Sequence, residues 1–194
     1  MSAGESRPVR DLLKGVNLYL IGMMGAGKTT VGRLLATQLN YRFVDTDEMI
    51  EKVVGKSITE IFAEEGETSF RELESKVLGE VAAYKNLVVA TGGGIILRQE
   101  NWGYLRHGVV VWLDVGVEQL YARVKEDKSR PLLQDPNPMA KLQSLLESRQ
   151  SLYSQADVRV RVEGSQTPKQ VAAVAFEDIR KALKTDRQQE AELN

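Results

Sequence analysis

The segment GMMGAGKT at residues 22–29 constrains the fold of this chain more than any other feature. It fits the pattern in which two glycines five places apart are followed by lysine and then by serine or threonine. Such a loop binds phosphate because its backbone N–H groups curl around the oxygens at a helix N-terminus. An apolar run at 16–21 precedes the segment and a helical pattern at 28–39 follows it. The sequence therefore predicts a nucleotide-phosphate site between a strand and a helix.

The residue types in this loop suggest what each would do. Lys28 is placed to reach the β- and γ-phosphates, and the hydroxyl of Thr29 can ligate Mg²⁺. The nucleotide-binding residues that the loop predicts are Gly25, Ala26, Gly27, Lys28, Thr29 and Thr30.

Short apolar segments alternate with amphipathic ones along the rest of the chain, which favours a parallel sheet covered on both faces. We predict strands at 16–21, 42–45, 87–90, 109–113 and 158–162, and helices at 28–39, 47–54, 67–83, 117–125, 139–153 and 169–184. Ser57 and Glu60 form a capping-box pattern before a further apolar pair. We expect one domain over residues 1–194, with a core at about 16–184, a mobile lid at about 127–138, and flexible tails at 1–14 and 185–194.

Composition argues against several classes of protein. A formal net charge of −1 gives no overall positive field for nucleic acid or anionic membrane. The chain has no cysteine, which excludes disulfides, thiolate zinc sites and cysteine nucleophiles. No apolar run approaches the roughly 18 residues that cross a bilayer, and residues 1–15 lack the apolar segment of a secretory signal. We therefore expect a cytoplasmic protein.

A phosphate-binding loop leaves the class of protein open. The sequence contains no Asn-Lys-x-Asp segment, with which GTPases read guanine, and it lacks the basic face of a DNA-handling ATPase. A small-molecule kinase and a nucleotide-binding module without catalysis remain.

Two carboxylates, Asp45 and Asp47, end the second predicted strand. If the strand continues through Asp47, both side chains point to the same side. One could then act on the water shell of a metal and the other on an acceptor hydroxyl. The pattern also fits a strand end followed by an aspartate that caps a helix.

Three further features fit a binding site. Arg71 and Glu74 are neighbours on one helix, although an ordinary surface ion pair explains them equally well. The glycines at 92–94 follow a strand where ligands bind in open α/β sheets. Arg149 continues the apolar face of a helix, where a guanidinium needs an anionic partner unless it extends to solvent.

Taken together, these segments resemble the shikimate kinase family. The matching segments are residues 22–30, FVDTD at 43–47, FRELE at 70–74, TGGG at 91–94, RPLL at 130–133, and Arg149 followed by Tyr153. They occur in the order of the family, and the resemblance runs from about residue 16 to about residue 183.

The resemblance implies an α/β fold of the nucleoside monophosphate kinase type: a three-layer sandwich with a five-stranded parallel sheet in the order 2-3-1-4-5 and a mobile lid. It also implies transfer of the γ-phosphoryl group of ATP to the 3-hydroxyl of shikimate, a step in aromatic amino acid biosynthesis. Another sugar-acid kinase of this fold, of the gluconate type, is the alternative.

The resemblance also implies roles for individual residues. Asp47 is the base, assisted by Lys28 and by Arg130 from the lid, and Thr29 and Asp45 serve Mg²⁺. Shikimate is bound by Asp47, Arg71, Gly92, Gly93, Gly94 and Arg149, with Glu74 orienting Arg71. Arg123, Arg130 and Pro168 complete the nucleotide site. We expect ATP and shikimate as the partners, no nucleic acid or membrane, and a monomer.

Overall fold

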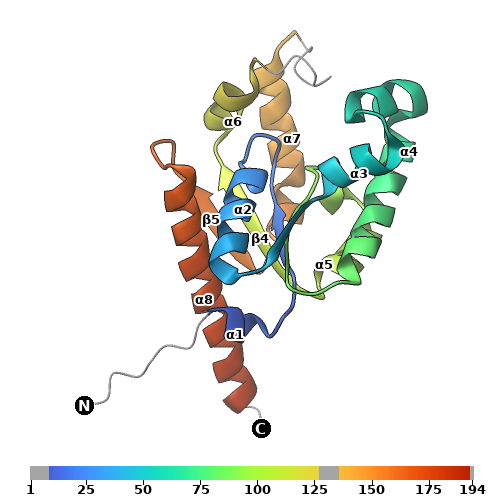
Figure 1. Cartoon of the computed structure of the whole chain (residues 1–194). Helices are drawn as coiled ribbons and strands as arrows, with labels where there is room; N and C mark the ends of the chain where they lie inside the picture. The colour runs from blue at the N-terminus through green and yellow to red at the C-terminus, as the bar shows by residue number, and fades with distance from the viewer. Residues whose placement is uncertain (1–8, 127–135, 193–194) are drawn as a thin grey trace.

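The computed structural model describes residues 9–126 and 136–192 of the chain (Figure 1). Its centre is a sheet of five parallel strands in the order β2-β3-β1-β4-β5, which confirms the predicted order. The strands are β1 Leu18–Ile21, β2 Arg42–Asp45, β3 Leu87–Ala90, β4 Val109–Val115 and β5 Val158–Val162. The helices are α1 Val9–Leu13, α2 Lys28–Leu39, α3 Thr46–Val54, α4 Ile58–Ala82, the 3₁₀ turn η1 Ile95–Leu97, α5 Gln99–Leu105, α6 Val117–Val124, α7 Pro138–Tyr153 and α8 Pro168–Glu192.

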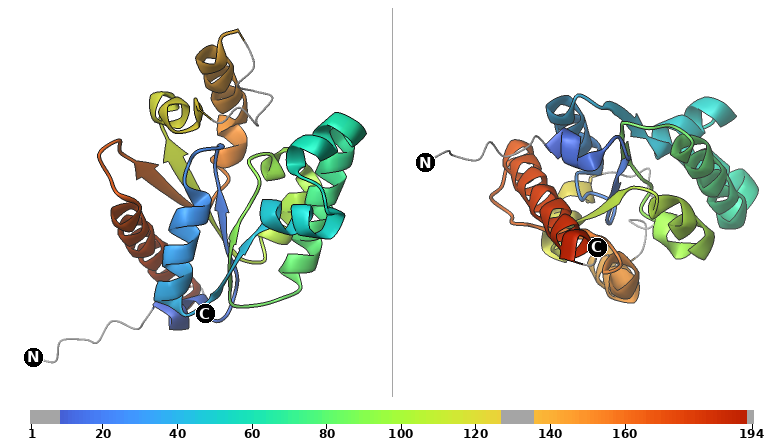
Figure 2. Two further views of the ribbon diagram at one scale, coloured as in Figure 1. Left: turned by 45° about the horizontal axis from the view of Figure 1, so that its top comes forward. Right: turned by 90° about the horizontal axis from the view of Figure 1, so that it is seen from below.

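Helices cover both faces of the sheet, as Figure 2 shows from below. Helices α2 and α8 pack together on one face, and α4 packs with α5 on the other. Strands β1 and β3 are buried throughout because helices cover both of their faces and strands flank both of their edges. In the edge strand β5, buried valines alternate with exposed arginines. The core therefore lies around the central strands, which fixes the positions of the loops at their ends.

Local sequence signals explain the ends of several helices. Ser57 and Glu60 form the predicted capping box at the start of α4. Gly55 ends α3 with φ of 73°, a left-handed conformation that glycine adopts without a steric penalty. Gly66 interrupts α4 with φ of 81° and ψ of 173°, so α4 consists of two helical segments that run in different directions (Figure 1).

The ends of the chain differ from the sequence-based expectation. Helix α1 lies within the predicted N-terminal tail, where Val9, Leu12 and Leu13 are buried and the helix packs against α8. A helix of five residues has no periodicity that a sequence reading can detect. Helix α8 continues to Glu192, beyond the predicted end at 184, because its last residues are mostly good helix formers.

Two further points concern the lid and the membrane. The segment 127–135, which includes Arg130 and most of the predicted lid, lies outside the described residues. Among the helices that are described, none is long and apolar enough to span a membrane.

Candidate functional site

The predicted site residues come together where the strands end. The phosphate loop follows β1, Asp45 ends β2, and the glycines at 92–94 follow β3. Because the strands are parallel, these three segments lie at the same end of the sheet, where the carboxyl ends of the strands meet at the top in Figure 1. We call this end of the sheet the sheet edge.

Glycines allow the phosphate loop to make its sharp turn between β1 and α2. Gly22, Gly25 and Gly27 have φ of 144°, 75° and 93°. A Cβ atom on Gly22 would lie 2.8 Å from the backbone oxygen of Leu113, closer than real contacts allow. The pattern of glycines is therefore required by the backbone itself.

Two cations lie against this loop. The Lys28 ammonium donates hydrogen bonds to the carbonyls of Gly22 at 2.8 Å and Met23 at 2.9 Å. Arg123 Nη1, from α6, donates to the carbonyl of Gly25 at 3.0 Å. The structure thus brings two of the three predicted nucleotide-binding cations to the loop, and the third, Arg130, lies outside the described residues.

The first residue of α8, Pro168, lies beside the start of α2. It lines a groove of about 510 Å³ together with Thr29, Thr30, Arg33, Leu34, Thr167 and Lys169. This groove adjoins the phosphate loop and places Pro168 on the nucleotide side of the site.

Asp45 connects the phosphate loop to α3. Its Oδ2 accepts a hydrogen bond from the Thr29 hydroxyl at 2.7 Å, and its Oδ1 accepts one from the backbone N–H of Asp47 at 3.0 Å. Asp45 is therefore the N-cap of α3. The argument from strand alternation was wrong, because the strand ends at Asp45 and the helix begins at Thr46.

The pair of Thr29 and Asp45 suits a hard cation. Within the described residues, no group of three or more His, Cys, Asp or Glu side chains could hold a metal alone. Mg²⁺ in nucleotide sites usually needs only one or two protein oxygens, because phosphate and water supply the other ligands. The oxygens of these two residues fit that requirement.

Asp47 and Glu74 converge on Gly92 from α3 and α4. A Cβ atom on Gly92 would lie 2.8 Å from Asp47 Oδ1 and would also meet Glu74 Oε1. Glu74 is 1% exposed, and this burial raises its pKa, while the charge of Arg71 opposes the shift. Gly92 is therefore the position at which two carboxylates reach the sheet edge.

Arg71 is held by two glutamates of its own helix. Its Nη1 donates to Glu74, and its Nε and Nη2 donate to Glu67 Oε1 at 3.3 Å and 3.0 Å. A Cβ atom on Gly94 would lie 2.7 Å from Arg71 Nη2. The missing side chain of Gly94 thus leaves room for the guanidinium at the sheet edge.

Arg149 reaches the same glycines from α7. Its Nη1 donates to the carbonyl of Gly93 at 3.3 Å, and the Tyr153 hydroxyl donates to that carbonyl at 3.1 Å. Burial raises the pKa of Tyr153 to about 12, while the nearby charges of Arg149 and Arg71 lower it. In this structure Arg149 therefore has a carbonyl as its partner, where the sequence suggested an anion.

Sequence reasoning gave no role to three contributors to this site, although Thr46 and Tyr153 belong to segments that match the family. Glu67 binds Arg71, the Tyr153 hydroxyl binds Gly93, and the buried Thr46 hydroxyl accepts a hydrogen bond from Gly92 N at 3.0 Å. The contact of Glu67 could have been expected from its position four residues before Arg71 on a predicted helix.

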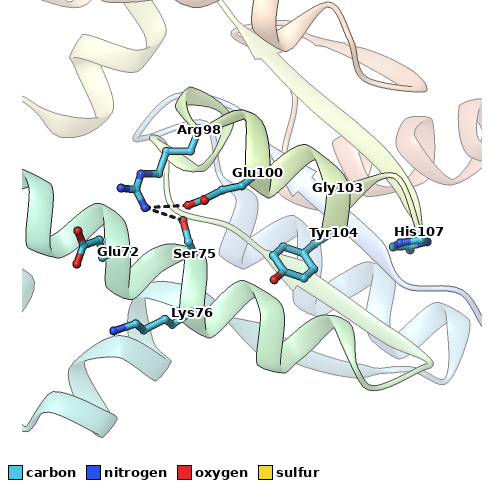
Figure 3. A pocket seen from close by; sticks show the side chains of 8 residues that line it. All are labelled: Glu72, Ser75, Lys76, Arg98, Glu100, Gly103, Tyr104 and His107. Atoms are coloured by element: carbon cyan, nitrogen blue, oxygen red, sulfur yellow. Dashed lines mark hydrogen bonds and ion pairs between the residues drawn. The ribbon is translucent and has the colours of Figure 1, made fainter.

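A second groove, of about 550 Å³, lies between α4 and α5 (Figure 3). It is lined by Glu72, Ser75, Lys76, Arg98, Glu100, Gly103, Tyr104 and His107. None of the predicted site residues lines this groove, so it is separate from the site at the strand ends.

Comparisons with known proteins agree on one family. The family model described as shikimate kinase matches residues 24–180. The shikimate kinase of Trichormus variabilis is 61% identical over 90% of this chain and 96% of its own, and that of Synechococcus elongatus is 52% identical over 89% and 90%.

Solved structures extend the comparison. The shikimate kinase of Acinetobacter baumannii, in complex with shikimate, has a TM-score of 0.81 and 41% identity over 92% of this chain and 98% of its own. A gluconokinase from Sinorhizobium meliloti, with a TM-score of 0.55 and 16% identity over 90% and 97%, is similar in fold alone.

Proposed function

Because this chain belongs to the shikimate kinase family and is an ATP-dependent phosphotransferase acting on shikimate, we propose that it transfers the γ-phosphoryl group to the 3-hydroxyl at the sheet edge described above. The products are shikimate 3-phosphate and ADP. The reaction is a step of the shikimate pathway.

One observation carries the assignment of the site. Asp47, the Arg71–Glu74 pair, the glycines at 92–94 and Arg149 come from four separate segments and meet beside the phosphate loop. The sheet edge thus carries a carboxylate able to accept a proton, two cations able to hold an acid, and a loop able to hold ATP. Phosphoryl transfer depends mainly on such positioning and on neutralising spread negative charge.

The phosphate loop and its cations hold ATP in this proposal. Lys28 exchanges its carbonyl partners for the β- and γ-phosphate oxygens, and the N-terminus of α2 contributes positive potential. Arg123 and Pro168 lie on the nucleotide side. Arg130, outside the described residues, reaches the phosphates from the lid, which excludes water from the γ-phosphate.

Kinase chemistry with ATP uses a divalent cation, and we assign Mg²⁺ to Thr29 and, through water, to Asp45. When bound, Mg²⁺ neutralises charge on the β- and γ-phosphates. The hydrogen bond of 2.7 Å between the two residues holds their oxygens side by side. The capping bonds to Asp45 Oδ1 fix the orientation of its carboxylate.

On the acceptor side, Asp47 binds the hydroxyls of shikimate and takes the proton of the attacking one. Arg71 and Arg149 grip the carboxylate of shikimate, since guanidinium groups match a planar carboxylate through paired N–H donors. Glu74, buried against Arg71, keeps this guanidinium oriented. The backbone at Gly93 lies between the acid end and the phosphate loop.

An ADP-release assay across three acceptor classes tests this proposal. We expect turnover with shikimate and none with gluconate or nucleoside monophosphates. Turnover with gluconate would favour a sugar-acid kinase of the same fold, and no turnover with any acceptor would favour a nucleotide-binding module. The acceptor site, the single domain, a cytoplasmic location and a monomeric state remain parts of the proposal.

A further inference from the structure

The side of Arg71 that faces away from Glu74 is occupied by a carboxylate of the protein. Glu67 Oε1 accepts hydrogen bonds from Nε at 3.3 Å and from Nη2 at 3.0 Å. This edge of a guanidinium is one that an incoming carboxylate can grip with two parallel bonds. Glu67 therefore takes a position that a substrate acid would also use.

The two glutamates on Arg71 differ greatly in burial. The Glu74 side chain is 1% exposed, whereas that of Glu67 is 63% exposed. Breaking the pair with Glu74 would leave a buried charge uncompensated. Water can replace Arg71 at the exposed Glu67, whereas the Arg71 side chain is itself only 16% exposed and needs another acceptor there, which an incoming acid supplies. An incoming acid can therefore displace Glu67 at small cost and leave the bond to Glu74 intact.

The backbone next to Glu67 also allows movement. Gly66, the preceding residue, breaks the helix with φ of 81° and ψ of 173°, and a Cβ atom there would meet nothing within 4 Å. Glu67 is thus the first residue after a bend in α4, with open space beside it. Its side chain can leave Arg71 without disturbing a packed core.

We propose that Glu67 is an internal stand-in for the substrate carboxylate, which holds Arg71 in position before the acid binds and competes with the acid for that guanidinium. This inference rests on the proposed function, because it requires Arg71 to bind the acid. Glu67 is thus a positioning residue that sets the affinity for the acid end of the acceptor.

The competition predicts that Glu67→Gln binds shikimate more tightly than the wild type. We expect the dissociation constant, measured by calorimetry without nucleotide, to fall roughly two- to fivefold, the factor that one exposed ion pair supplies. The dissociation constant of shikimate methyl ester should not fall, because a neutral ester does not compete for the ion pair.

Glu72→Gln is the matched control. Glu72 follows Arg71 on the same helix but lines the separate groove between α4 and α5 (Figure 3). The Glu72→Gln variant removes the same charge without freeing Arg71, so it measures the general effect on shikimate binding of one negative charge fewer. Three results would each overturn the inference. The first is an equal gain in shikimate affinity in both variants, and the second is a gain in affinity for the ester as well as for the acid. The third is shikimate binding by Glu67→Gln that is unchanged or weaker.

Arg71→Ala separates this inference from the proposed function. If Arg71→Ala leaves shikimate affinity unchanged, Arg71 does not bind the acid and the proposed acceptor site is wrong. If Arg71→Ala weakens binding while Glu67→Gln behaves like Glu72→Gln, the acceptor site stands and only the competition is wrong.

Discussion

Lys28 and Arg149 both donate hydrogen bonds to backbone carbonyls of the loops in which we expect them to bind substrates. A cation at the edge of a sheet needs an acceptor at all times, because desolvating it without one is costly. These carbonyls are neutral acceptors, which bind a cation more weakly than an anionic oxygen does. In the proposed function, substrate binding at these residues is therefore an exchange of acceptors around cations that are already in place.

The exchange predicts that Lys28→Ala abolishes turnover and leaves the protein folded. The hydrogen bonds that this variant loses at the carbonyls of Gly22 and Met23 should together contribute no more than about 1–3 kcal/mol to the free energy of unfolding. Steady-state kinetics and thermal unfolding measure the two effects. Lys76→Ala, in the groove between α4 and α5, should keep wild-type turnover. Activity of Lys28→Ala within tenfold of the wild type would contradict the nucleotide assignment.

Asp45 and Asp47 should fail in different ways when each is replaced by asparagine. Asp47→Asn removes the acceptor of the hydroxyl proton, so the chemical step should slow by roughly 10²–10⁴-fold. Asp45→Asn should instead raise the Mg²⁺ concentration that half-maximal activity requires. Its stability should change little, because asparagine caps a helix about as well as aspartate. Turnover measured across a Mg²⁺ titration checks both, and rescue of Asp47→Asn alone by excess Mg²⁺ would reverse the assignment.

At the scale of elements, the glycines after β3 leave room for charged side chains from two helices. Gly92→Ala should slow turnover strongly, because its Cβ would lie 2.8 Å from Asp47 Oδ1 and would displace that carboxylate. The backbone of Gly92 has no positive φ, so the effect is steric. We expect a loss of about 1–3 kcal/mol of stability as well.

Gly103→Ala is the control for this substitution. Gly103 lies in α5, and a Cβ atom there would meet nothing within 4 Å. Alanine should therefore stabilise the helix by about 0.5–1 kcal/mol without affecting turnover. Chemical denaturation and kinetics compare the two variants, and wild-type turnover by Gly92→Ala would show that Asp47 tolerates the added methyl group.

Elements with strong local signals were predicted to the residue. Helix α2 and strands β2, β3 and β5 have the predicted bounds, because a phosphate loop, a capping residue or a short apolar run marks each end. Helix α1 was missed because five residues are too few to show a helical pattern, and its packing against α8 is a tertiary contact. The break at Gly66 agrees with the predicted start of a helix at residue 67, although the sequence did not reveal the backbone angles of that glycine.

The site was predictable as a set of residues and not as a set of contacts. Motifs named Thr29 and Asp45, but the capping role of Asp45 depends on where the helix begins, which the sequence placed one residue late. Likewise, the sequence could not show that Arg149 binds a carbonyl in the substrate-free protein. Contacts between distant segments depend on the tertiary fold, which local patterns do not encode.

At the scale of the whole molecule, the fold brings together, from separate helices, the two arginines that we propose bind the acid. Arg71 lies on α4 and Arg149 on α7, and both lie close enough to Tyr153 to lower its pKa against the effect of burial. The two guanidinium groups thus come from segments that are far apart in the sequence. In the proposed function, the preference for an acid as acceptor therefore depends on the assembled fold.

This arrangement predicts that shikimate methyl ester is a very poor substrate, although its hydroxyl groups are unchanged. Esterification removes the anion and leaves two guanidinium groups facing a neutral group. Breaking such a charge-assisted pair typically costs about 2–5 kcal/mol, so kcat/KM should fall roughly 30-fold to several thousand-fold. Arg149→Lys should retain little of the preference for the acid over the ester, because an ammonium lacks the planar fork of donors. Replacing Arg71 and Arg149 together by alanine should narrow the gap between ester and acid, since neither cation would then favour the anion. Equal kcat/KM of the wild type for ester and acid would mean that these arginines have another role.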